Sequence, residues 1–135
     1  MTVRNQQEQT ESEPLSVDKR LSLLSSRLRR YLLYTLSTYS TPVPLPEIAD
    51  AVTTLEHGTP AEEYPDERLA IYTSLYHNHL PQLADAGVVR YEQSDDSVEL
   101  GPNAGELVPL LELTITHDRP AENGGLREPD LESLS

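Results

Sequence analysis

Cysteine is absent from this chain of 135 residues, and lysine occurs once, as Lys19. The absence of cysteine excludes disulfides, thiolate zinc sites, iron–sulfur clusters and cysteine nucleophiles. No apolar run approaches the roughly 18 residues that span a bilayer, and the N-terminus lacks a basic-then-apolar signal pattern. We therefore expect a soluble, cytoplasmic protein with no membrane attachment and no cofactor.

Recognisable catalytic motifs are also lacking. There is no glycine-rich phosphate loop, no nucleophile elbow and no pair of metal ligands at helical spacing. His77 and His79 are two residues apart, so on a helix their side chains point about 200° from each other and cannot readily share an ion. We therefore predict that the chain is not an enzyme and has no metal site. We expect His79 to pack at a core edge or a helix interface.

The charge balance is strongly acidic. The formal net charge is −13, from 23 acidic and 10 basic residues. At molar ionic strength the Debye length is only about 3 Å, so the self-repulsion of such a surface is tolerable. Together with the near absence of lysine, this indicates adaptation to concentrated salt. The alternative is an acidic protein of ordinary salt conditions.

The length fits one domain with tails. Residues 1–15 are polar and have no apolar period, and residues 116–135 are also polar. Such segments cannot bury enough apolar surface to fold. We therefore expect two disordered tails flanking one folded domain over residues 16–115.

Helical periodicity runs through most of that domain. A short turn is expected over residues 16–24, followed by a helix capped by Ser25 or Ser26. The apolar stripe of this helix comprises Leu28, Tyr31, Leu32, Thr35, Leu36 and Tyr39. Three prolines make residues 41–46 extended, with a short strand at Val43, and Pro46 then suits the start of a second helix.

A third helix is expected from Asp66 onward. Its predicted core face comprises Leu69, Tyr72, Tyr76, Leu80 and Leu83. Ile71 and Leu75 lie on the flank of that face. Pro81 lies inside the segment, so we expect a kink or a break near Asn78.

A helix stop and a strand start meet at Gly87. Glycine adopts the left-handed conformation that closes a helix, and the β-branched Val88 and Val89 favour extended chain. Residues 88–91 and 97–100 alternate apolar and polar around a turn-forming segment, which predicts a hairpin. A last helix follows through Leu107 and Leu111. The fold class is therefore mainly α with a small β-hairpin (α+β).

This order of elements resembles the winged helix-turn-helix of archaeal and bacterial transcription regulators. Two stretches, LSSRLRRYLLYTL at residues 24–36 and LYHNHLPQL at residues 75–83, look like a haloarchaeal winged-helix domain family of unassigned function. The resemblance covers about residues 21–113. It implies the fold and a saline habitat, and no ligand or target.

The outward face of the third helix is the candidate DNA-reading surface. We expect Thr73, Ser74, His77 and Asn78 to project from it. Asparagine can form two hydrogen bonds with an adenine base, and serine or threonine can form hydrogen bonds with several base edges or with phosphates. The alternative interpretation is an ordinary solvated helix face.

Arginine supplies the candidate phosphate contacts. Arg27, Arg29 and Arg30 form the sole basic cluster of the sequence. The guanidinium group of arginine can form bidentate hydrogen bonds with phosphate oxygens. Pairing with acids of the same domain, such as Glu47 or Asp85, is the alternative. Arg90 on the hairpin could add one contact, although a cross-strand pair with Glu99 is the more ordinary expectation.

Two functions remain open from the sequence. The first is a DNA-binding transcription regulator of winged-helix type that works in high salt on double-stranded DNA as a homodimer. The dimer would form through the last helix, alone or with the helix over residues 26–39. The alternative is a winged-helix protein-interaction module that does not bind DNA. Carboxylates around the outward face of the third helix would favour the module, whereas arginines beside it would favour DNA.

Overall fold

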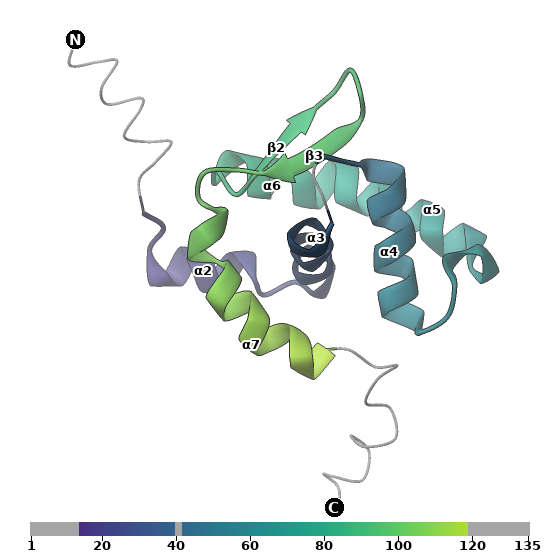
Figure 1. Cartoon of the computed structure of the whole chain (residues 1–135), viewed down its shortest axis with the longest axis horizontal. Helices are drawn as coiled ribbons and strands as arrows, with labels where there is room; N and C mark the ends of the chain where they lie inside the picture. Colours follow the sequence, from purple (N-terminus) through teal and green to yellow (C-terminus); the bar gives the residue numbers. More distant parts are fainter. Residues whose placement is uncertain (1–13, 40–41, 119–135) are drawn as a thin grey trace, which may run out of the picture.

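The computed structural model describes residues 14–39 and 42–118 (Figure 1). Most of these residues are helical, and three short strands form an antiparallel sheet. The elements are α2 (Val17–Leu23), α3 (Arg27–Thr38), β1 (Val43–Pro44), α4 (Leu45–His57), η1 (Ala61–Glu63), α5 (Pro65–Ser74), η2 (Leu75–His79), α6 (Leu80–Asp85), β2 (Val89–Glu92), β3 (Ser97–Leu100), η3 (Ala104–Glu106) and α7 (Val108–Asp118). The α+β class is confirmed.

The expected tails lie mostly outside the described residues. Helix α7 continues to Asp118, past the domain boundary expected at residue 115. At the other end, the Leu15 backbone N–H donates to Oε1 of Glu106 at 2.7 Å. The packed part of the chain is therefore slightly longer at both ends than the polarity of the sequence indicates.

Local signals set most helix ends as expected. The hydroxyl of Ser16 accepts from the Lys19 N–H and caps α2, and the hydroxyl of Ser26 accepts from the Arg29 N–H and caps α3. Helix α4 contains Pro46 in its first turn and ends at Gly58, whose φ is 78°. Serine oxygens satisfy N–H groups that have no partner in the first turn, and glycine adopts the left-handed conformation without a Cβ penalty.

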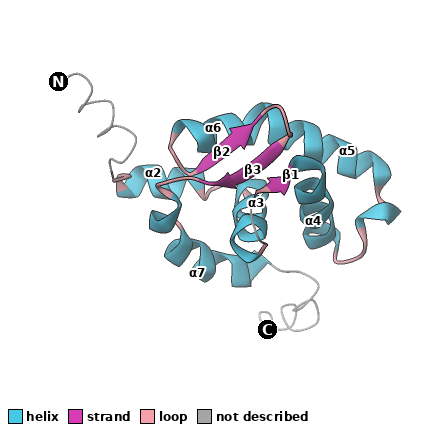
Figure 2. Ribbon diagram, turned by 45° about the horizontal axis from the view of Figure 1, so that its top comes forward, coloured by secondary structure: helices cyan, strands magenta, loops and turns pink. Residues whose placement is uncertain are grey.

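The hairpin gains a third strand. The strand order is β1-β3-β2, with Val43 opposite Val98 and Arg90 opposite Glu99 (Figure 2). The cross-strand position of Arg90 and Glu99 is as predicted. Because β1 directly precedes α4, its pairing with β3 ties the start of that helix to the hairpin.

Helix α3 occupies the centre of the molecule. It packs against α4, α7, β3 and η2, and the views in Figures 1 and 2 show these elements around it. Its Tyr31, Leu32 and Leu36 side chains are at most 1 % exposed. Full burial of one such side chain contributes about 1.5–3 kcal/mol. Tyr39, predicted for the same stripe, instead follows the helix in extended conformation and is 48 % exposed.

The third predicted helix is irregular close to Asn78, where a kink or a break was expected. It passes from α5 into η2, a π-helical turn, where the Leu80 N–H donates to the Leu75 carbonyl five residues earlier, and continues as α6. A π turn relieves the interior proline, which lacks an N–H and clashes with the preceding turn. Residues 65–85 therefore remain helical without a gap, and the expected irregularity takes the form of a π turn.

The π turn also changes which residues reach the core. Leu75 and Leu80 are five residues apart and both are buried with Leu83, whereas Leu69 is 62 % exposed. Leu80 and Leu83 belong to the predicted core face and are buried as expected, whereas the prediction for Leu69 was wrong, because the inserted residue rotates the two halves of the helix relative to each other. Tyr72 is only partly buried.

Candidate functional site

The outward face of α5 and η2 carries the predicted reading residues. Thr73, His77 and Asn78 are exposed, and Ser74 is half-buried. The His77 ring contacts the edge of Tyr76 with ring centroids 4.9 Å apart. These four side chains therefore lie at the surface, where their hydrogen-bonding groups can reach a partner.

Asp96 attaches the hairpin to this helix. Its carboxylate accepts from the hydroxyl of Tyr72 on α5 at 2.7 Å and from that of Tyr91 on β2 at 2.5 Å. The Asp96 backbone carbonyl also accepts from the Leu45 N–H at the start of α4. The hydrogen bonds to Asp96, followed by burial, raise the pKa of both tyrosines. Through its side chain and its backbone carbonyl, this one residue thus holds helix, hairpin and α4 in a fixed relation.

Asp96 also has an unusual backbone conformation. Its φ is 52°, and it is the sole non-glycine residue with positive φ in the part of the chain that the structure describes. Aspartate and asparagine tolerate this region better than other residues. Sequence reasoning treated Asp96 only as a turn former, and no local pattern indicates its tyrosine partners.

An aromatic notch lies between the helix and the hairpin. Tyr76 and Tyr91 meet edge to face with centroids 5.9 Å apart. The notch has a volume of about 380 Å³ and is lined by Tyr76, His77, Leu80, Pro81, Ala84, Tyr91 and Gln93. It gives the surface an apolar element next to His77.

The arginine cluster is used inside the molecule. Arg29 is 8 % exposed and donates to the carbonyls of Leu23 at 2.7 Å and Ser22 at 3.1 Å, and to Nδ1 of His79 at 3.1 Å. The interface position predicted for His79 is confirmed. Burial, followed by the charge of Arg29, lowers the pKa of His79. The phosphate role expected of Arg29 is therefore corrected to a structural one.

The two other arginines of the cluster have acidic partners. Arg30 forms a bidentate pair with Asp118, at 2.6 and 3.0 Å, and also donates to the Leu24 carbonyl. Arg27 pairs with Glu56 at 3.1 Å. Pairing within the domain was the alternative considered for these residues, but the partners differ from Glu47 and Asp85.

Unpaired positive charge is consequently scarce near the reading face. Arg68 binds Asp50, and Arg20 lies 3.8 Å from Glu106. Within residues 14–39 and 42–118, only Lys19 and Arg90 combine an exposed cation with no ion pair. Exposed carboxylates in the helix and hairpin are those of Asp66, Glu67, Asp85, Glu92 and Asp95.

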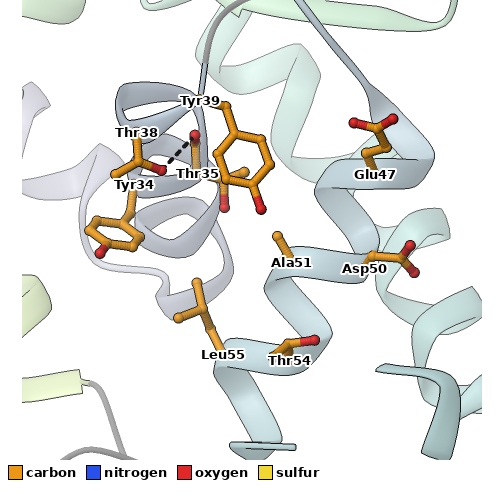
Figure 3. Close-up of a pocket in the computed structure, with 9 residues that line it drawn as sticks. All are labelled: Tyr34, Thr35, Thr38, Tyr39, Glu47, Asp50, Ala51, Thr54 and Leu55. Carbon is orange, nitrogen blue, oxygen red and sulfur yellow. Dashed lines mark hydrogen bonds between the residues drawn. The ribbon is translucent and has the colours of Figure 1, made fainter. Parts of the chain in front are cut away.

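A groove separates α3 from α4 on another part of the surface (Figure 3). Its volume is about 400 Å³, and its lining consists of Tyr34, Thr35, Thr38, Tyr39, Glu47, Asp50, Ala51, Thr54 and Leu55. The sequence analysis did not identify this groove. The misplacement of Tyr39 in the core stripe explains the omission, because the exposed ring contributes to its wall.

Family comparison identifies one matching domain. A family described as a domain of unknown function (DUF7344) matches residues 21–99, which is more than half of the chain. The chain belongs to this family. The matched region runs from α2 to β3 and includes the reading face and the hairpin, whereas α7 follows it. No curated protein and no solved structure matches the chain.

Two further features bear on the kind of site. None of the helices among the described residues is long and apolar enough to cross a membrane. In the same part of the chain, no three histidine or acidic side chains are grouped so that they could hold a metal ion.

Proposed function

We propose that this chain is a winged-helix regulator that binds double-stranded DNA in high salt, related to haloarchaeal winged-helix domains. The observation that carries the proposal is a helix with exposed Thr73, His77 and Asn78, braced against a hairpin by Asp96. A recognition helix in the major groove needs such side chains at a fixed angle to the wing. The succession of helix, short strand, two helices, hairpin and helix agrees with this type of domain.

Binding would depend little on phosphate attraction. Nonspecific affinity arises mainly from counterion release and falls by about 0.9 log units per neutralised phosphate for each tenfold rise in salt. Arg90 is the one cation near this surface without an ion pair among the described residues. Asn78 and His77 would therefore provide direct hydrogen bonds to bases, which suits a saline cytoplasm better than a basic patch would.

A second candidate function is supported by the charge of the same face. Asp66 and Glu67 begin α5, Asp85 ends α6, and Glu92 and Asp95 lie on the hairpin and its turn. Such a rim repels phosphates and suits a protein partner with basic groups. In this alternative the domain is a protein-interaction module whose apolar contact is the exposed Leu69.

We also propose that the regulator is a homodimer through α7. Leu113 on this helix is 68 % exposed, while Leu111 and Ile115 on the opposite side are buried. An exposed leucine on the side of the helix that faces away from the core favours a second packing partner. Two copies would present two recognition helices to adjacent half-sites, which increases affinity without added positive charge.

Selection from a random duplex pool in molar KCl tests DNA binding directly. We expect an enriched sequence that the wild-type chain binds, and loss of binding when His77→Ala and Asn78→Ala are combined. Ser37→Ala, at an exposed position on α3 outside both the reading face and α7, is the control and should bind normally. Absence of any enriched sequence, together with capture of a basic protein that His77→Ala and Asn78→Ala release, would support the interaction module instead.

A further inference from the structure

The groove between α3 and α4 has the dimensions of a small-molecule site. Its volume of about 400 Å³ lies within the range of roughly 300–1,000 Å³ for ligand pockets. Ala51 and Leu55 form an apolar floor on α4, and aromatic surface comes from Tyr34 on α3 and from Tyr39 just after it. Figure 3 shows the hydroxyl of Tyr39 directed toward the space above Ala51.

The charged side chains that line the groove are all acidic. Glu47 and Asp50 lie on the α4 side of the groove, and the lining includes no lysine, arginine or histidine. Asp50 is bound by Arg68 from α5, whereas Glu47 has no ion pair within the described part of the chain. The groove thus combines an available carboxylate with electron-rich rings, which excludes anionic ligands.

We propose that this groove binds a small organic cation, an ammonium group carried on an aromatic or alkyl body. The body would cover Ala51 and Leu55, and the ammonium would lie between Glu47 and the ring of Tyr39. An ammonium within about 6 Å of a ring centroid is attracted by the ring quadrupole as well as by the carboxylate. The site is independent of DNA binding and would exist in either of the functions proposed above.

Concentrated salt sharpens the selectivity of this site. Attraction of a hydrated inorganic cation to Glu47 from a distance is strongly screened at molar ionic strength, whereas a direct contact between Glu47 and an ammonium held in the groove is screened much less. Burial of an apolar body persists, because excluded salts strengthen apolar association rather than weaken it. An organic amine therefore competes effectively with abundant inorganic cations.

Nuclear magnetic resonance titration of the full chain in molar KCl provides the test. Phenethylamine is the probe, and 3-phenylpropionate, which has the same ring and stem with an anionic end, is the matched ligand control. We expect saturable shifts of amides in residues 34–39 and 47–55 with the amine and none with the carboxylate. Equal shifts with both ligands, or none with the amine, would overturn the proposal.

Substitutions in the groove test where the ammonium group of the ligand binds. We expect Glu47→Gln and Tyr39→Leu each to weaken phenethylamine binding about threefold to fivefold, as loss of an exposed charge or ring contact predicts. Glu112→Gln, an exposed acid on α7, is the control and should bind like wild type. Wild-type dissociation constants for both groove variants would contradict the proposed site. A melting scan of each variant verifies that the fold is retained.

Discussion

The guanidinium of Arg29 donates to Nδ1 of His79 across 3.1 Å, and this contact joins α3 to the π turn η2. Arginine has no acceptor, so Nδ1 must be unprotonated and the neutral ring carries its proton on Nε2. Arg29, a candidate phosphate contact in the sequence, and His79, an expected interface residue, therefore form a part-buried contact that is sensitive to charge.

Protonation of His79 should destabilise the fold. Burial and Arg29 lower its pKa in the folded state, so the unfolded chain binds the proton more readily. The stabilising contribution is complete above the unfolded pKa of about 6.5 and is lost as the pH falls from there through the folded pKa. We expect the melting temperature in molar KCl to decrease over that window.

A variant separates His79 from other titrating groups. His79→Asn keeps an acceptor for Arg29 but does not titrate, so the decrease in melting temperature below about pH 6.5 should become smaller. Gln93→Asn, at an exposed position without a titrating group, is the control and should keep the wild-type pH profile. An unaltered profile in the His79 variant would assign the pH dependence to other residues.

Arg29→Lys should be strongly destabilising. Lysine keeps the charge but cannot reproduce the fork that reaches the carbonyls of Leu23 and Ser22, and those acceptors lie in a part-buried turn. We expect a loss of about 2 kcal/mol or more in the free energy of unfolding, measured by chemical denaturation. Arg27→Lys, at an exposed pair with Glu56, should cost less than about 1 kcal/mol. Similar losses for the two variants would contradict the structural role.

Asp96→Asn should loosen the hairpin. Asparagine tolerates the positive φ but loses the charged acceptor shared by Tyr72 and Tyr91. We expect a cost of about 1–2 kcal/mol in unfolding free energy and faster hydrogen exchange in β2 and β3. Tyrosinate absorbance should show the pKa of Tyr91 falling toward its ordinary value of about 10. Asp95→Asn, at the exposed neighbouring position, should change neither quantity.

Gly101→Ala should disrupt the junction between hairpin and α6. A Cβ at this position would lie 2.6 Å from the Gly87 carbonyl oxygen, and backbone atoms cannot move aside by a side-chain rotation. We expect a loss of about 1–3 kcal/mol, as for overpacked sites. Gly105→Ala is the control, because no heavy atom lies within 4 Å of its added Cβ. Equal stability of both variants would show that the loops adjust freely.

Leu113→Glu should separate the proposed dimer. A carboxylate at this exposed position on α7 would be buried between two copies at a large cost. Light scattering in molar KCl should give the mass of two protomers for the wild type and of one for the variant. Leu69→Glu, an equally exposed leucine on α5, should keep the dimer mass. A wild-type mass of one protomer would rule out the dimer.

Sequence reasoning placed the elements well where the cause is local. Ser16 and Ser26 cap their helices, Gly58 ends α4, and Gly87 has a φ of 75° at the helix-to-strand junction. Each of these effects depends on neighbours within a few residues. The exposure of Thr73, His77 and Asn78 also followed from helical spacing, since it separates them from the predicted stripe through Tyr76 and Leu80.

Contacts between residues that are far apart in the sequence could not be predicted in the same way. The partner of Arg29 is 50 residues away in the chain, and that of Arg30 is 88 residues away. Asp96 meets Tyr72 across 24 residues. Because several acids could have paired with each arginine, only the packing of α7 and η2 against α3 could select among them.

By itself, the sequence determined the order of helices and strands, their ends and the acidic charge, because these follow from short-range conformational preference and composition. The tertiary structure decided the phase of the helix through Pro81, the burial of Arg29 and the exposure of Tyr39. These depend on how whole elements fit together: a π turn, a buried guanidinium and an open groove arise only when α3, α4 and the helix over residues 65–85 are packed in space.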